Sequence, residues 1–189
     1  MGIKIASMSR LLKCANNDDI VTIRAVDMPT AILFTFESPT CGRVSQYELK
    51  LMELDIEHLT IPNTEYPCEI NMPSVEFQKI CKDLGQIGDF VKIFCSTECI
   101  EFSTQGDLGS GSVKLRQNSS SEDQAVQIRA ADSVTLAFSL HYLNLMAKAT
   151  QLSKNVCLSL SPELPLAIEY SIPDTGFLRY YLAPKINED

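Results

Sequence analysis

The sequence predicts an α+β protein built from short antiparallel strands and a few short helices. Along most of the chain, short segments alternate between apolar and polar residues, which is typical of strands with one buried face. Other segments place apolar residues at helical spacing and charged residues on the opposite face. The order of elements also repeats, because residues 7–51 and 139–183 each hold a serine-started helix with a late lysine, followed by three strands. Such a repeat indicates a duplicated structural unit.

The N-terminal elements follow from caps, turns and alternation. Residues 2–5 are expected to end a strand, and Ser7 is expected to cap a helix over residues 8–15. Turn residues separate this helix from the next elements. Those elements are strands, expected at residues 20–25, 31–36 and 43–51.

The stretch from Val44 to Pro67 begins as an alternating strand and then becomes an acidic run. Pro62 and Pro67 cannot donate to a sheet ladder, so they close the strand and start an extended segment. Long connectors are uncommon inside compact domains and often serve binding. We therefore expect residues 51–67 to form an interdomain connector with a binding role.

The middle of the chain begins with a strand at residues 68–72 and a helix capped by Ser74. Its apolar stripe falls at spacings of three and four, and Gly85 and Gly88 end it. The stripe consists of Phe77, Ile80, Cys81 and Leu84. The strands that follow are expected at residues 90–95, 99–103, 111–116, 125–130 and 134–139, with a polar loop at 118–123.

The C-terminal part repeats the N-terminal order. A helix is expected over residues 140–150, and strands at 156–160, 165–172 and 177–183. Residues 68–189 would then hold both halves of the duplicated unit, whereas residues 1–50 would hold only a second half. Half a unit leaves an apolar sheet face uncovered, so we expect such a face in residues 1–50.

The charge of the chain bears on its partners. With a net charge of −8, the 189-residue chain does not suit a protein that coats nucleic acid with its whole surface, although a local basic stripe remains compatible. Basic and polar side chains fall on the outer faces of the three expected helices, at Arg10, Lys13, Lys79, Lys82, Gln86, His141, Asn144 and Lys148. Two interpretations stay open, namely solvated helix faces or one basic surface that attracts duplex phosphates without reading bases.

Metal binding and catalysis find little support in the residue pattern. Seven cysteines without a repeating spacing and only two histidines do not suggest a zinc site, and we expect reduced, buried thiols. The glycines at 106–111 join two strands and do not open a helix, so we interpret them as a turn. His58 and His141 are poor partners for a thiol nucleophile. We expect no enzyme, no metal and no cofactor, and no apolar run reaches the roughly 20 residues of a membrane helix.

Long motifs throughout the chain resemble the eukaryotic sliding clamp family, proliferating cell nuclear antigen. They are SMSRLLKCANNDDIVTIRA, FESP, VSQYELKLMELDIEHLTIP, INMPS with ICKDLGQIGD, GDLGSGSVKL and FLRYYLAPKI. The resemblance implies a DNA clamp fold, with antiparallel β-sheets outside and helices on the inner face. It implies the second half of a first clamp domain at 1–50, the connector at 51–67 and a complete second domain at 68–189. The first half of the family's first domain has no counterpart, so we expect a truncated or diverged clamp.

The resemblance also implies a function. The expected protein is a DNA polymerase processivity factor and a scaffold for replication and repair proteins in the nucleus. It would encircle double-stranded DNA without sequence preference as a homotrimer, or as a mixed ring with a full-length clamp. DNA polymerases, the clamp loader and repair proteins would bind through short peptide motifs. The alternative is a clamp-like interaction module that binds partner peptides or clamp subunits without encircling DNA.

Site residues are implied position by position. The inward basic residues would be Arg10, Lys13, Lys79, Lys82 and Lys148, with His141 and Asn71 where the family usually carries basic residues. The subunit interface would pair the strand containing Val44, Gln46, Tyr47 and Lys50 with a neighbour's strand containing Gly111, Val113 and Leu115. The partner-peptide pocket would use Leu59, Ile61, Tyr66, Leu164, Pro165, Tyr181, Ala183 and Pro184. Thr97 stands where the family carries a modifiable lysine, so that signal should be lost.

Overall fold

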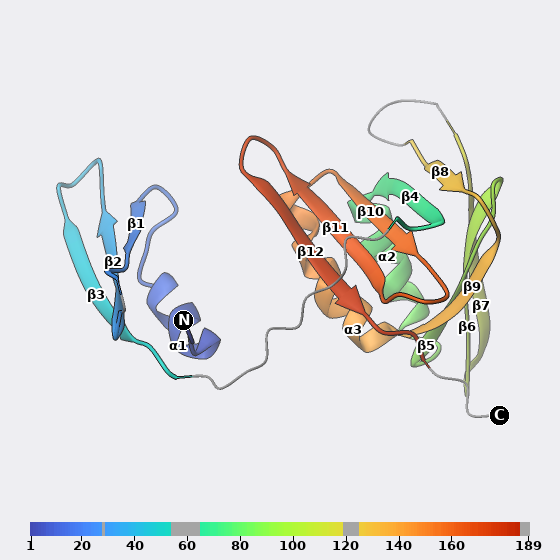
Figure 1. The fold of residues 1–189 in the computed structure, drawn as a ribbon, viewed down its shortest axis with the longest axis horizontal. Helices are drawn as coiled ribbons and strands as arrows, with labels where there is room; N and C mark the ends of the chain where they lie inside the picture. Colours follow the sequence, from blue (N-terminus) through green and yellow to red (C-terminus); the bar gives the residue numbers. More distant parts are fainter. Residues whose placement is uncertain (28, 54–64, 119–124, 186–189) are drawn as a thin grey trace. The chain divides into compact units, whose positions relative to one another are not determined.

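The computed structural model describes residues 1–27, 29–53, 65–118 and 125–185 (Figure 1). The chain divides into two compact units, residues 1–62 and residues 63–189, which we call unit 1 and unit 2. We describe each unit by itself. The division of the sequence into 1–50, 51–67 and 68–189 stays a prediction.

The described residues of unit 1 form one helix on a three-stranded antiparallel sheet. The helix is α1 (Ile5–Leu12), and the strands β1 (Ile20–Arg24), β2 (Ala31–Glu37) and β3 (Val44–Lys50) lie in the order β1-β2-β3. Along β2 every second side chain is buried, which confirms the expected alternation. The buried set, against which Met8 and Leu11 of α1 pack, is Ile32, Phe34, Phe36 and Leu49.

The start of α1 differs from the expectation. The helix begins at Ile5, and the main-chain N–H groups of Ser7 and Met8 donate to the Lys4 carbonyl at 2.9 and 3.1 Å. Ser7 is therefore inside the helix and is not its cap. Gly2 forms an isolated bridge with Met52 in place of a strand end. That bridge fixes the chain just ahead of Lys4, so the helix starts at once.

Unit 2 contains two antiparallel sheets, one ordered β12-β11-β10-β4-β8 and the other β7-β6-β5-β9. We call them the five-stranded and the four-stranded sheet. The first half of unit 2 contains β4 (Cys68–Pro73), α2 (Ser74–Leu84), β5 (Phe90–Cys95), β6 (Cys99–Gly106) and β7 (Gly109–Arg116). The second contains β8 (Gln127–Ala130), β9 (Val134–Ser139), α3 (Leu140–Met146), the 3₁₀ helix η1 (Ala147–Leu152), β10 (Asn155–Leu160), β11 (Leu166–Ile172) and β12 (Gly176–Leu182).

The core of unit 2 joins both sheets and both helices. Its largest side chains, with no more than 1% exposure, are Tyr170, Phe77, Phe102 and Phe138. The predicted stripe on α2 is buried as expected, because its four residues all face this core. Burial of such large apolar side chains contributes roughly 1.5–3 kcal/mol each, so the core orients α2 firmly.

Two helices of unit 2 depart from the predicted boundaries and caps. The helix expected over residues 140–150 ends at Met146 and continues as the 3₁₀ helix η1. Ser74 is the first residue of α2 and makes no cap. Its buried hydroxyl instead donates to the carbonyl of Ser153 at 2.5 Å, a contact that spans 79 residues and that no local pattern reveals.

The cysteines also differ from the expectation of reduced, buried thiols. Cys68 on β4 and Cys95 on β5 form a disulfide that joins the two sheets, and both are fully buried. Cys14 and Cys41 are exposed. The spacing of the cysteines could not reveal the pair, because folding alone brings β4 and β5 together.

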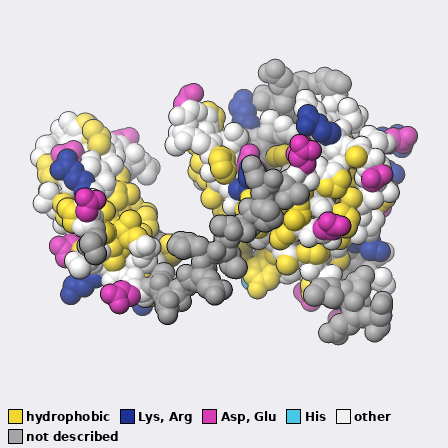
Figure 2. All heavy atoms as spheres, viewed as in Figure 1, with side chains coloured by type: hydrophobic (Ala, Val, Ile, Leu, Met, Phe, Trp, Pro, Cys, Tyr) yellow, Lys and Arg dark blue, Asp and Glu magenta, His cyan; other side chains and the backbone are white. Residues whose placement is uncertain are grey.

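The internal repeat is visible in the topology. The run α1-β1-β2-β3 has the same order as α3-η1-β10-β11-β12. In unit 2 the far edge of β10 pairs with β4, whereas β1 has no second neighbour among the described residues of unit 1. Val21 and Ile23 lie opposite Phe36 and Phe34 and are 42% and 53% exposed. These exposures are those expected for an uncovered apolar face, and Figure 2 shows hydrophobic side chains gathered on the visible side of unit 1.

Candidate nucleic-acid interface

Three polar side chains tie the two helical segments of unit 2 into one layer. The Ser74 hydroxyl holds the start of α2 to the chain just after η1. Gln78 Nε2 on α2 donates to the Ala147 carbonyl at 2.9 Å, and Asn144 Nδ2 on α3 donates to the Cys81 carbonyl at 3.1 Å. Each contact joins two residues that are more than 60 positions apart in the sequence. They therefore fix the spacing of the exposed faces of the helices.

The exposed face of this layer carries Lys79, Lys82 and Lys148. Gln78 faces η1, and Lys82 lies one helical turn further along the same side of α2. Lys148 directly follows Ala147, the residue that Gln78 contacts. All three lysines are exposed, and the elements that carry them, α2 and η1, bury other residues in the core.

His141 and Lys148 are both exposed and border a hollow of about 320 Å³ between the end of α2 and α3. Asp89 lines the same hollow and offsets part of its positive charge. Asn144 also lines it, but its amide is already engaged by the carbonyls of Cys81 and Leu140. The interpretation of Asn144 as part of a free outer face is therefore wrong.

In unit 1, α1 shows the same division into two faces. Met8 and Leu11 pack on the sheet, and Arg10 and Lys13 are exposed. Lys13 is the C-cap residue, where a positive charge favours the helix dipole. Asn71 on β4 is exposed but lies on the five-stranded sheet, which the helix layer does not include.

The two strands expected at a subunit interface are both outer strands. β3 ends the sheet of unit 1, and β7 ends the four-stranded sheet of unit 2. The Tyr47 ring packs at 5.5 Å from that of Phe36, and Val113 and Leu115 pack against the core. The free groups on these strands are mainly main-chain donors and acceptors, together with exposed side chains such as Val44, Gln46 and Lys50.

Part of the expected partner pocket is brought together in unit 2. The Tyr66 hydroxyl donates to the Pro165 carbonyl at 2.9 Å, and burial together with nearby Tyr181 raises the pKa of Tyr66. Leu164, Pro165, Tyr181 and Pro184 are half-buried, and Ala183 is exposed. Leu59 and Ile61, like His58, lie outside the described residues.

Sequence reasoning missed the side chains that position the helix layer. Ser74 was interpreted as a cap and Asn144 as a surface residue, and Gln78 carried no signal at all. Among the described residues, no three His, Cys, Asp or Glu side chains cluster to hold a metal. No helix within that part of the chain is long and apolar enough to cross a membrane.

Comparison with protein families gives two adjacent matches that together span nearly all of the chain. The family model described as the proliferating cell nuclear antigen N-terminal domain matches residues 1–58. The model described as the C-terminal domain of the same antigen matches residues 60–185. The matches meet within the expected connector.

Proposed function

Because the chain belongs to the proliferating cell nuclear antigen family, we propose that it holds DNA polymerases and repair proteins on double-stranded DNA as a subunit of a trimeric ring in the nucleus. The family consists of sliding-clamp processivity factors, non-enzymatic scaffolds that bind DNA and partner proteins.

The observation that supports this proposal is that Lys79, Lys82 and Lys148 are exposed on helical segments that side-chain hydrogen bonds hold together. A DNA duplex carries one charge per ~1.7 Å of its axis, and dispersed ammonium groups attract it without reading the bases. Weak contacts of this kind exchange rapidly along the duplex, which suits a sliding protein. Arg10 and Lys13 on α1 would extend the same lining, and His141 would add a polar position.

Ring closure would use the free edges of β3 and β7. An edge strand exposes unpaired main-chain groups, and pairing between edges satisfies both. When β3 of one subunit pairs with β7 of the next, the contact is head-to-tail and closes if the rotation permits. A homotrimer, or a mixed ring with a full-length clamp, is the proposed assembly.

Partner proteins would dock near Tyr66, Pro165 and Tyr181. The half-buried side chains there offer apolar surface for a short peptide motif from a polymerase, clamp loader or repair protein. Burying one aromatic plug contributes roughly 1.5–3 kcal/mol, which supports exchangeable binding. Leu59, Ile61, Leu164, Ala183 and Pro184 are the other residues proposed for this pocket.

A second candidate is an interaction module that binds partner peptides or clamp subunits without encircling DNA. The exposed side chains of Val21 and Ile23 favour it, because apolar groups on the core side of an edge strand invite another protein. In that case the assembly would bury this face of unit 1, and DNA would play no part.

The deciding experiment is polymerase extension on circular primed DNA with a clamp loader. We expect the chain to lengthen the products, and the variant Lys79→Ala with Lys148→Ala to lose most of this effect. The charge-matched variant Arg24→Ala with Arg129→Ala should keep it. Sedimentation at several concentrations supplies the assembly state. A monomer at every concentration, with no lengthening of products, contradicts the ring and supports the second candidate.

A further inference from the structure

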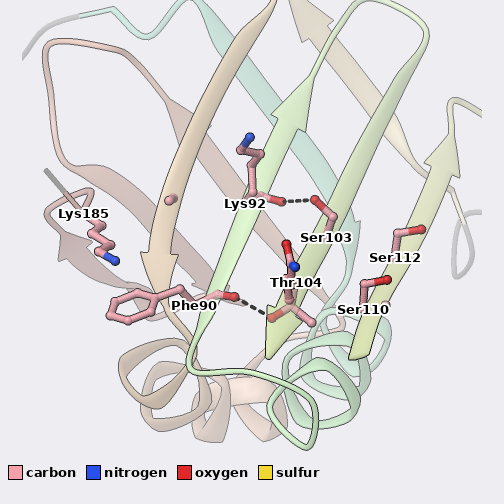
Figure 3. Close-up of a pocket in the computed structure, with 10 residues that line it drawn as sticks. Phe90, Lys92, Ser103, Thr104, Ser110, Ser112 and Lys185 are labelled. Carbon is pink, nitrogen blue, oxygen red and sulfur yellow. Dashed lines mark hydrogen bonds between the residues drawn. The ribbon is translucent and has the colours of Figure 1, made fainter. Parts of the chain in front are cut away.

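The outer face of the four-stranded sheet contains an open groove that the proposed function does not use. Its volume is about 620 Å³, and Figure 3 shows its lining residues, which come from β5, β6, β7 and β9 and from the segment after β12. Lys92 stands near the middle, Ser110 and Ser112 lie along β7, and Phe90 lies beside Lys185. The groove belongs entirely to unit 2.

The strand register explains why the sheet is hollow here. Ser112 lies opposite Ser103, Ser103 opposite Lys92, and Lys92 opposite Ala137. This row crosses all four strands and contains only small side chains besides Lys92. The next row carries the larger side chains of Lys114, Glu101 and Phe94. A row of small residues between larger ones forms a trough that crosses the strands.

The charge of the trough contrasts with that of the chain. Among the described residues, its lining includes Lys92 and Lys185 and no carboxylate, although the whole chain carries a net charge of −8. Within the described residues, neither lysine forms an ion pair. The nearest acid in the register, Glu101, lies directly opposite Lys114. Two unpaired ammonium groups in one groove attract an anionic ligand.

The other polar groups of the trough divide into engaged and available ones. The Ser103 hydroxyl donates to the Lys92 carbonyl at 3.5 Å. The Thr104 hydroxyl is engaged, because it donates to the Phe90 carbonyl at 2.6 Å. The side chains of Ser110, Ser112 and Gln105 are exposed, and they make no hydrogen bond to any described residue. Hydroxyl and amide groups both donate and accept, as the main chain of an extended peptide requires.

The groove suits a peptide better than a nucleic acid. Single strands bind where bases can stack on aromatic rings along a basic channel. Phe90 is the only aromatic side chain that the described part of the chain contributes to the lining, and the Lys185 ammonium already covers its ring at 4.3 Å from the centroid. The shallow, open shape also lacks the enclosure typical of small-molecule pockets.

We propose that this groove binds a short extended peptide segment of a partner protein that carries glutamate or aspartate side chains. Lys92 and Lys185 contact the carboxylates, and Ser110, Ser112 and Gln105 hydrogen-bond the peptide main chain. The site is separate from the pocket at Tyr66 and Pro165, so a partner that uses both is held at two points. Two linked contacts bind much more tightly than either alone.

The test uses the full chain and a fluorescein-labelled peptide of alternating glutamate and glycine, compared with the same peptide in which glutamine replaces glutamate. Fluorescence anisotropy measures affinity at low salt. We expect the glutamate peptide to bind and the glutamine peptide to bind at least about tenfold more weakly. The variant Lys92→Glu with Lys185→Glu should bind the glutamate peptide about tenfold more weakly than the wild type does. Lys114→Glu, on the same sheet but outside the trough, should change affinity by less than about twofold.

Nuclear magnetic resonance then locates the contact. We expect the glutamate peptide to shift the amide resonances of residues 103–112, and inorganic phosphate at equal ionic strength to leave them in place. Equal losses in the Lys114→Glu and the double variant would overturn the proposal, as would equal binding of the two peptides. Stronger perturbation by phosphate, or by a labelled single-stranded oligonucleotide, would assign the groove to a different ligand and overturn it too. Thermal melts of the variants verify folding, and neither lysine is buried.

Discussion

The side-chain amide of Asn144 on α3 donates to the main-chain carbonyl of Cys81 on α2, with a nitrogen–oxygen distance of 3.1 Å. The same amide also reaches the Leu140 carbonyl at 2.9 Å. One side chain therefore links α2, which carries Lys79 and Lys82, to α3, which continues into η1 with Lys148. The position of these lysines depends on a residue that does not itself need to touch DNA.

We expect Asn144→Ala to lower the free energy of unfolding of unit 2 by about 1–3 kcal/mol, because the Cys81 carbonyl loses its side-chain partner in a partly buried place. Urea unfolding followed by circular dichroism measures the change. Gln86→Ala, on the exposed side of the chain just after α2, is the matched control and should alter stability by less than about 0.5 kcal/mol. Equal effects of the two substitutions would show that the link contributes nothing.

Replacing Lys79, Lys82 and Lys148 with Ala should weaken binding to a DNA duplex and reduce its dependence on salt. Each lost phosphate contact lowers the slope of log affinity against log salt by ~0.9, so three contacts lower it by about 3. Filter binding or anisotropy over a salt series measures the slope. The control changes Lys92, Arg129 and Lys185 to Ala, which removes the same charge from positions outside the helices. If the control variant lowers the slope of log affinity against log salt by the same amount, the DNA contacts lie elsewhere on the protein.

The pKa of Asp19 lies below its ordinary value of 3.8, mainly because the Asn16 main-chain N–H donates to its carboxylate, with Arg43 nearby at 3.2 Å. A carboxyl group whose pKa is lower in the folded than in the unfolded state stabilises the folded protein at pH values above the unfolded-state pKa. That contribution is lost as the pH falls through the folded pKa. We therefore expect Asp19→Asn to destabilise unit 1 at neutral pH and to differ less from the wild type as the pH falls below about 3.8.

Thermal melts of both proteins between neutral pH and strongly acidic pH measure this convergence. Asp27→Asn is the control, because Asp27 is exposed and makes no hydrogen bond or ion pair to any described residue. Parallel curves for the wild type and Asp19→Asn across the whole range would contradict the assignment.

Reduction of the Cys68–Cys95 disulfide should destabilise unit 2 by roughly 2–4 kcal/mol, because the bond restrains the unfolded chain. Urea unfolding with and without a phosphine reductant measures the shift. The variant Cys68→Ala with Cys95→Ala should not respond to the reductant. A wild-type midpoint that reductant leaves unchanged would mean that the bond is absent or contributes nothing in solution.

Burial raises the pKa of Cys81 to about 12, so this thiol should resist alkylation in the native protein.

Much of the secondary structure follows from the sequence, because it depends on local periodicity. The alternation along β2 and the stripe on α2 report burial directly, since each side chain's face is set by its own position. The turn joining β6 and β7 was also expected from its glycines, and these strands run to Gly106 and from Gly109. Helix ends were less accurate. α1 begins before the expected cap, and α3 gives way to η1, because contacts with other segments decide where a helix stops.

The candidate site also contains residues that the sequence could predict and residues that it could not. The exposed lysines were predictable from helical spacing, because a charged side chain opposite an apolar stripe must face solvent. The residues that hold the helices in place were not, since Gln78 contacts a carbonyl 69 residues away and Ser74 one 79 residues away. The hydrogen bond from Tyr66 to the Pro165 carbonyl joins positions 99 residues apart, and the resemblance alone suggested that these residues lie together.

The sequence by itself determined the α+β class, the repeated order of elements, the buried stripes and the exposure of the lysines on the helices. Only the tertiary structure decided that Cys68 and Cys95 are bonded, that Asn144 links two helices and that small side chains from four strands align into a groove. The physical reason is the distance along the sequence over which each feature depends on other residues. Periodicity records whether a side chain faces solvent or core, whereas a specific contact depends on which distant strand or helix the folded chain places against it.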